Sequence, residues 1–105
     1  MAKYLFIYHG GSMPETDEEV TEVMGQWMSW LEGLGDSVVD AGNPVGLSST
    51  VNTDGSVSGN GGANPANGYG IFLADSQEEA ENIAKKCPAL LAGGTVEVAM
   101  IVEMD

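Results

Sequence analysis

Hydrophobic positions in the first half of the chain change from a strand pattern to a helix pattern and back. Residues 3–9 are largely apolar on both alternating sets, which predicts a strand that is covered on both faces. Thr16 and Glu19 form a capping box, and apolar residues then recur every three or four positions over residues 20–34. This spacing predicts a helix, and residues 37–41 predict a short second strand after it.

The second half repeats the order of strand, helix and strand. Residues 68–74 predict another strand with two apolar faces. Ser76 begins a second capping box, for a helix that carries Cys87 on its apolar face and is stopped by Pro88. Residues 95–104 predict the final strand. The two halves together predict an α+β sandwich in which the helices cover one face of a sheet.

Residues 47–67, between the two halves, have a different pattern. Asp54 and Gly55 make a turn signal, with Val51 before it and Val57 after it, and a stretch rich in Gly and Asn follows. We expect a short hairpin and then a mobile loop here.

The face of the sheet that no helix covers predicts how the chain assembles. In the first, third and last predicted strands both alternating sets are mostly apolar, whereas a face open to water should be polar. The sequence predicts no further helix that could cover this face. We therefore expect a homodimer, with sheet facing sheet around a two-fold axis.

Composition narrows the possible partners and location. The chain has 105 residues, enough for one domain over residues 1–105, and a net charge of -13 from 16 acids against three lysines. Without clustered basic residues we expect it to bind neither nucleic acid nor anionic membranes. The sequence has no apolar run long enough for a membrane span and no signal pattern, and its single cysteine fits a reducing compartment. We expect a cytoplasmic protein whose acids form a solubilising shell or an adaptation to high salt.

Nearly the whole chain resembles the YCII-related (YciI-like) family. The residues that carry the resemblance are Trp27 and Trp30, the D-A-G-N-P stretch at 40–44, Gly68-Tyr69, Asp75-Ser76, Cys87-Pro88 and Glu97. The resemblance implies a ferredoxin-like βαββαβ sandwich with an antiparallel sheet, paired into a dimeric α+β barrel. It also implies a ligand-sized pocket, either between sheet and helix or in the barrel.

The sequence departs from the family at two places that matter for function. The YciI-type branch has a histidine on the first helix, proposed as an acid/base with an acidic partner, whereas residues 24–27 here read Met-Gly-Gln-Trp. The D-G-P-F signature of another branch is replaced by Gly-Asn-Gly-Gly at 59–62. The family's catalytic pair therefore does not transfer to this chain.

Two residues are candidates for acid/base catalysis. His9 is the sole histidine and ends the first strand beside a glycine loop, where it either reaches a pocket mouth or makes one structural hydrogen bond. Asp40 lies in a strand between Val39 and Ala41 and is either a base facing a pocket or an edge carboxylate in water. Glu97 and Glu103 alternate on one side of the last strand, which favours an exposed edge.

Three aromatic residues are candidates for ligand binding. Trp27, Trp30 and Tyr69 either wall a pocket for an apolar or aromatic molecule or belong to the core or the dimer interface. Cys87, at the end of a helix, is not expected to be a nucleophile. The spacing of His, Cys and acidic residues predicts no metal site, and we expect no cofactor.

The sequence leaves two classes of function open. The first is a non-catalytic protein that binds a small apolar or aromatic molecule in a homodimeric α+β barrel. The second is a small-molecule enzyme with lyase-, isomerase- or hydrolase-like activity that uses Asp40 and His9 as acid and base.

Overall fold

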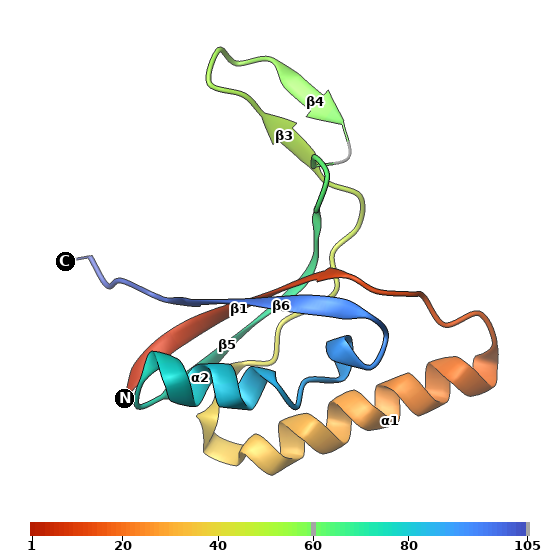
Figure 1. Ribbon diagram of the computed structural model, residues 1–105, viewed down its shortest axis with the longest axis vertical. Coiled ribbons are helices and arrows are strands. Elements are labelled where there is room, and N and C mark those ends of the chain that lie inside the picture. Colours follow the sequence, from red (N-terminus) through yellow and green to blue (C-terminus); the bar gives the residue numbers. More distant parts are fainter. Residues whose placement is uncertain (60, 105) are drawn as a thin grey trace.

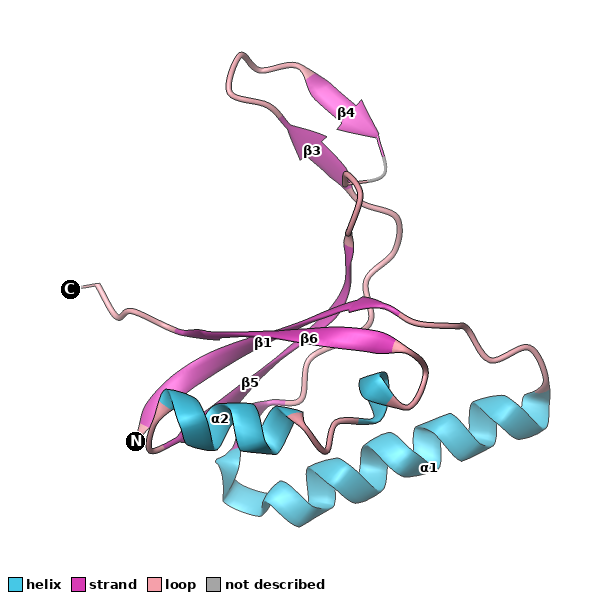
Figure 2. Ribbon diagram, viewed as in Figure 1, coloured by secondary structure: helices cyan, strands magenta, loops and turns pink. Residues whose placement is uncertain are grey.

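The computed structural model describes residues 1–59 and 61–104, and the elements below are those of this part of the chain. In chain order they are β1 (Ala2–Gly10), α1 (Asp17–Leu34), η1 (Gly35–Ser37), β2 (Val38–Asp40), β3 (Ser49–Val51), β4 (Val57–Gly59), β5 (Ala66–Ala74), α2 (Gln77–Ala84), η2 (Pro88–Leu90) and β6 (Gly94–Met100) (Figure 2). Asn60, in the predicted loop, and Asp105, at the end of the predicted domain, lie outside the described residues.

Four strands form an antiparallel sheet in the order β2-β5-β1-β6. With the hairpin set aside, these are the second, third, first and fourth strands along the chain, which is the ferredoxin-like order. Both helices lie on one side of the sheet, as Figure 1 shows. The predicted α+β fold with its antiparallel ferredoxin-like sheet is therefore confirmed.

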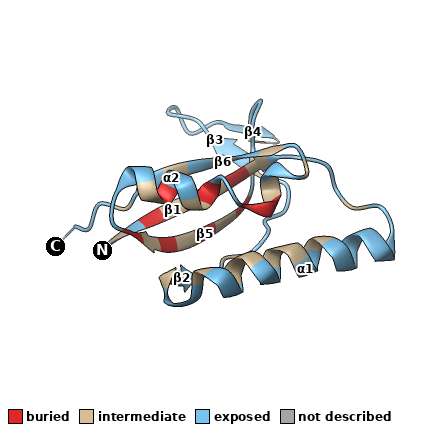
Figure 3. Ribbon diagram, turned by 60° about the horizontal axis from the view of Figure 1, so that its bottom comes forward, coloured by how far each residue is buried: buried red, intermediate tan, exposed pale blue. Residues whose placement is uncertain are grey.

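The core lies between the sheet and the helices. Strand alternation sends every second side chain of β1 and β5 toward the helices, and these positions are buried in turn along both strands (Figure 3). On β1 and β5 the buried side chains of the core are large or apolar, and small residues of α2 pack onto them. The core comprises Tyr4, Phe6, Tyr8, Phe72, Ala74, Ala80, Ala84 and Cys87.

Two elements end earlier than the sequence predicts. Helix α2 stops at Ala84, so Cys87 lies beyond it with extended backbone angles of φ -69° and ψ 135°. Because a proline disfavours helical angles in the residue before it, Pro88 ends the helix upstream of its own position. Strand β6 stops at Met100 rather than at residue 104. Its pairing with β1 ends where Met100 lies opposite Tyr4, and one further hydrogen bond runs from the Ile101 N–H to the Lys3 carbonyl at 2.8 Å.

The predicted hairpin is confirmed as β3 and β4, which pair from Ser49 with Gly59 to Val51 with Val57. Figure 1 shows it standing clear of the four-stranded sheet, on the side away from the helices. All of its strand residues are exposed. The return strand β5 begins at Ala66, inside the segment for which we expected a loop.

The face of the sheet that carries no helix, here called the open face, is apolar at its centre. Its side chains alternate with the core positions of β1 and β5 and are half-buried in the single chain. They include Leu5, Ile7, Ile71 and Leu73. Because strand register pairs Leu5 with Ile71 directly, these side chains form one continuous patch.

Among the described residues no helix combines the length and the apolar character that crossing a membrane requires.

Candidate functional site

A pocket of about 820 Å³ lies between α1 and the edge of the sheet, and we call it the α1 pocket. Its walls come from α1, from the loop after β1, from the segment after β2 and from the residues around η2. Most of its lining is apolar, with Tyr8, Met24, Trp27, Met28, Leu31 and Pro44 among the larger side chains. The pocket exists because α1 stands off the sheet on bulky aromatic side chains, and no residue of α1 is fully buried.

Two glycines of β5 make room for the tyrosine in the pocket wall. A Cβ at Gly70 would lie 2.8 Å from the Phe72 ring and 3.2 Å from the Tyr8 hydroxyl oxygen. A Cβ at Gly68 would lie 3.2 Å from the Tyr8 ring. The ring therefore lies close against the glycine backbone of β5, and it also contacts Trp27 edge to face, with the ring centroids 5.0 Å apart.

The three predicted ligand-binding aromatics lie in three different environments. Trp27 lines the α1 pocket. Trp30 instead packs on Phe72, with ring centroids 5.2 Å apart, and does not line the pocket. Tyr69 borders the pocket, but strand alternation turns its side chain to the open face, opposite Ile7. Trp27 and Trp30 touch each other edge to face at 5.7 Å, so α1 links the pocket wall to the core.

The Tyr8 hydroxyl is a buried polar group without a hydrogen-bond partner in the described part of the chain. Tyr8 is only 6% exposed. Burial raises the pKa of Tyr8 far above its ordinary value, and its charge interaction with Cys87 adds in the same direction. A buried hydroxyl without a partner costs about 1–3 kcal/mol. The Tyr8 hydroxyl oxygen is enclosed by protein atoms, so Tyr8 contributes its ring and not its hydroxyl to the pocket wall.

The polar side chains around the pocket mouth are acidic or neutral. Glu19, Glu22 and Gln26 lie along α1 at spacings of three and four residues and line the pocket together. The Thr16 hydroxyl accepts from the Glu19 N–H at 3.1 Å, which is one half of the predicted capping box. The Glu19 carboxylate accepts from the backbone N–H of Glu15 at 2.8 Å instead of from that of Thr16. Across the pocket the Ser12 N–H donates to the carbonyl of Ala92 at 2.8 Å and fastens the loop after β1.

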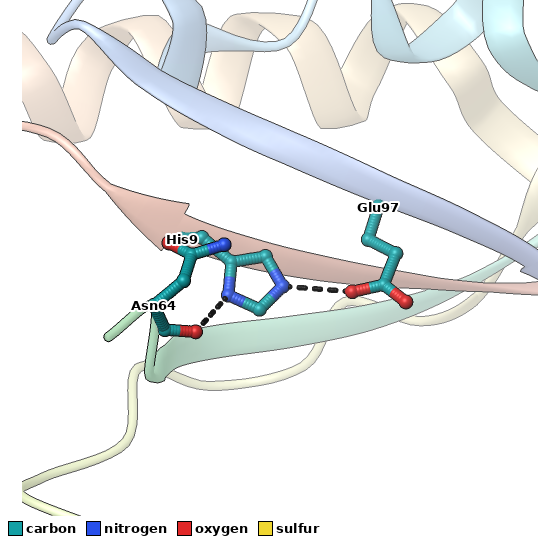
Figure 4. Close-up of polar contacts among 3 residues, drawn as sticks. All are labelled: His9, Asn64 and Glu97. Carbon is teal, nitrogen blue, oxygen red and sulfur yellow. Dashed lines mark hydrogen bonds and ion pairs between the residues drawn. The ribbon is translucent and has the colours of Figure 1, made fainter. Parts of the chain in front are cut away.

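His9 lies on the open face, on the other side of the sheet from the α1 pocket. Its Nδ1 lies 3.0 Å from the carbonyl oxygen of Asn64, and its Nε2 lies 2.9 Å from Oε1 of Glu97 (Figure 4). Both facing atoms are acceptors, so only an imidazolium with a proton on each nitrogen satisfies both. The pair joins β1 to β6 and to the base of the hairpin, and the His9 side chain is 11% exposed.

Asp40 occupies the edge strand β2 and is exposed. Its Oδ1 accepts a hydrogen bond from the Gly42 N–H at 2.8 Å, which turns the chain after the strand. Asp40 pairs with Ile71, and Ile71 pairs with Leu5, which is four residues from His9 along β1. At about 3.3 Å per residue, Asp40 and His9 are separated by roughly 13 Å along the strand direction. They do not form an acid/base pair within one chain, and their catalytic roles stay predictions.

Among residues 1–59 and 61–104 no three His, Cys, Asp or Glu side chains gather closely enough to hold a metal ion.

Sequence reasoning did not single out Tyr8, and it did not find the pairing of His9 with Glu97. The sequence feature that could have pointed to Tyr8 is the glycine at two alternate positions of the paired strand, Gly68 and Gly70. Alternate glycines leave space on one face of a strand, where a large side chain of the neighbouring strand can lie. The pairing of His9 with Glu97 depends on the register between the first and last strands and on the hairpin base. Neither can be read from local patterns.

Comparisons with known proteins give a distant likeness to solved structures. No family model and no curated protein sequence matches the chain. A solved structure that is similar is 5-chloro-2-hydroxyhydroquinone dehydrochlorinase from Burkholderia phenoliruptrix, in complex with 2,5-dihydroxybenzoquinone. The identity is 22% over 95% of this chain and 91% of the other, with a TM-score of 0.48. At this level neither the ligand nor the reaction of that enzyme transfers, and the resemblance to the YCII-related family stays a prediction.

Proposed function

We propose that this protein binds a small apolar or aromatic molecule in the α1 pocket and that it works as a homodimer. The observation that carries the proposal is the pocket itself, about 820 Å³ in volume and lined mainly by apolar side chains. Ligand pockets of about 300–1,000 Å³ with apolar walls and a few polar groups are typical of small-molecule binding. Trp27 supplies an aromatic wall, and Met24 and Met28 supply flexible ones that adapt to the shape of a ligand.

The homodimer is supported by the open face. Leu5, Ile7, Ile71 and Leu73 form a half-exposed apolar patch, and packing two such patches together would remove them from water. A two-fold axis makes one self-complementary patch sufficient for both subunits. The resemblance to the YCII-related family implies the same arrangement, a dimeric α+β barrel.

The indole N–H signals of the two tryptophans test ligand binding directly. We expect 4-ethylphenol, a neutral aromatic probe, to shift the Trp27 signal in a ¹H–¹⁵N correlation spectrum at millimolar concentration. The Trp30 signal should move less, because Trp30 packs on Phe72 and does not line the pocket. Trp27→Phe and Trp30→Phe assign the two signals. If a panel of neutral apolar and aromatic molecules left the Trp27 signal unmoved, the proposal would be wrong.

The second candidate function is acid/base catalysis on a small molecule. The observation that favours it is the His9–Glu97 contact, since a carboxylate beside an imidazole can hold and move a proton. Asp40 would serve as a separate base, and Asp40→Asn keeps the oxygen that accepts from Gly42. We expect Asp40→Asn and His9→Gln to abolish turnover with little change in Tm if these groups are catalytic. Loss of folding in Asp40→Asn would assign Asp40 to structure instead.

A further inference from the structure

The charges around the α1 pocket have one sign. Glu19 and Glu22 are the charged residues that line it in the described part of the chain. The lysines of the sequence, Lys3, Lys85 and Lys86, do not belong to this lining. With a net charge of -13 on the whole chain, an anionic ligand would meet repulsion both at a distance and at the mouth. The pocket therefore disfavours aromatic acids.

The same surroundings favour a positive charge at the mouth of the pocket. Glu22 is exposed on α1, and Gln26 follows one turn later on the same side of the helix. Trp27 adds an aromatic ring next to these polar groups, and a cation over an aromatic ring gains about 0.5–1 kcal/mol at exposed sites. The Glu22 carboxylate, the Gln26 amide and the Trp27 ring can therefore all interact favourably with an ammonium group.

Behind the mouth the pocket wall is mostly apolar. The Tyr8 side chain belongs to this wall, but its hydroxyl oxygen is enclosed by protein atoms and is not reached from the pocket. The wall therefore fits an apolar or aromatic ligand body, and the polar selection lies at the acidic mouth.

We infer that the ligand of the α1 pocket is an amine, with its ammonium group at Glu22 and an apolar or aromatic body against Trp27. This inference rests on the proposed function, because it names the chemical class of the molecule that the same pocket binds.

Three probes that differ in the charge of one substituent test the inference. Tyramine, 4-ethylphenol and 4-hydroxyphenylacetate share the phenol ring and are cationic, neutral and anionic at pH 7. Binding is followed through the Trp27 indole signal at low ionic strength. We expect tyramine to bind at least about tenfold more tightly than the anion, which corresponds to about 1.4 kcal/mol. The neutral probe should fall between them, and 1 M NaCl should narrow the difference because salt screens exposed charges.

Two matched variants locate the charge effect. Glu22→Gln should weaken tyramine binding about two- to fivefold and leave 4-ethylphenol unchanged, as expected for one exposed ion pair. Glu32→Gln removes the same charge from an exposed position of α1 outside the pocket lining, and it should leave both affinities unchanged. Equal effects of the two variants would mean that net charge, and not Glu22, attracts the amine, and would overturn the inference.

The outcomes separate this inference from the proposed function. If 4-ethylphenol and the anion bind as tightly as tyramine, the pocket binds aromatics without selecting amines, and only the inference fails. If none of the three probes moves the Trp27 signal, both fail. A loss of tyramine selectivity confined to Glu22→Gln supports the inference.

Discussion

Tyr8 and Cys87 are weak acids that the fold keeps neutral. Burial raises the pKa of the Cys87 thiol from 9.0 to about 11, and burial also raises the pKa of the Tyr8 hydroxyl. Cys87 is 1% exposed and caps the short turn η2, where burial raises the thiol pKa more than the hydrogen bond from the Ala89 backbone lowers it. Both residues contribute to packing in their protonated forms, and neither is prepared to act as a nucleophile.

These two shifts predict how stability depends on pH. A group whose pKa is raised in the folded state contributes its full stability below its ordinary pKa and loses that contribution as pH rises through the folded value. We expect the free energy of unfolding to fall from about pH 9 to pH 11, measured by urea titration. Cys87→Ala should flatten this decline, although it lowers stability at pH 7 by removing buried atoms.

Alkylation of Cys87 provides an independent measure. With a pKa of about 11 instead of 9.0, the thiolate fraction at pH 8 is about 100-fold smaller in the folded chain than in the unfolded chain. We expect iodoacetamide to react at least that much more slowly with the native protein than with protein in urea. Equal rates would mean that Cys87 is accessible in its ionised form.

At the scale of elements, the hairpin of β3 and β4 shows how local chemistry orders a segment without a core. The Asp54 carboxylate accepts hydrogen bonds from the Ser56 N–H at 2.9 Å and from the Ser56 hydroxyl at 2.6 Å. Asn52 donates to the hydroxyl oxygens of Ser56 and Ser58 across the turn. Because the strand residues are all exposed, these polar contacts define the turn in place of apolar burial.

The Asp54 contacts predict a local acid transition. The hydrogen bonds from Ser56 lower the pKa of Asp54, so their contribution is complete above its ordinary pKa and is lost as pH falls through the lowered value. We expect the protection factor of the Ser56 amide, which is its intrinsic exchange rate at the given pH divided by the observed rate, to fall in acid and in Asp54→Ala at neutral pH, measured by NMR. Asp54→Asn, which keeps one acceptor oxygen, should behave close to the natural chain at neutral pH. A change in global Tm would contradict the local role.

Elements and sites differed in how far the sequence could predict them. Alternation and capping predicted both helices and the strands of the sheet, because each pattern is local and the caps at Thr16 and Ser76 form as expected. The sequence pattern predicts that helix α2 reaches Cys87, whereas the helix ends at Ala84 because Pro88 disfavours helical angles in the residue before it. The neighbours of His9 depend on strand register and on the base of the hairpin, and these are set by contacts far apart in the sequence.

The whole molecule combines a strongly acidic surface with an apolar open face. Like charges on two subunits repel, while burial of the central apolar side chains of the sheet favours association. Raising the salt concentration screens the repulsion, with a Debye length of about 10 Å at 0.1 M and about 3 Å at 1 M. Dimer formation should therefore strengthen with added NaCl.

Substitution of one open-face residue tests the dimer. Ile71 lies in β5 and pairs with Leu5 at the centre of the patch, so Ile71→Asp would bury a charge in the proposed interface. We expect light scattering to give twice the monomer mass for the natural chain and the monomer mass for Ile71→Asp. Leu47→Asp introduces the same charge at a fully exposed apolar residue outside the sheet and should stay dimeric. If the natural chain is monomeric at micromolar concentration, the proposed homodimer is wrong.

The projecting hairpin also makes the protein easy to label. Its tip, residues 52–56, lies away from the core and the α1 pocket and is exposed throughout (Figure 1). Cys87 is buried and the sequence has no other cysteine, so Thr53→Cys would place the one readily accessible thiol at this tip. A dye attached there would follow association between subunits by energy transfer, and the fold and the pocket would keep their natural residues.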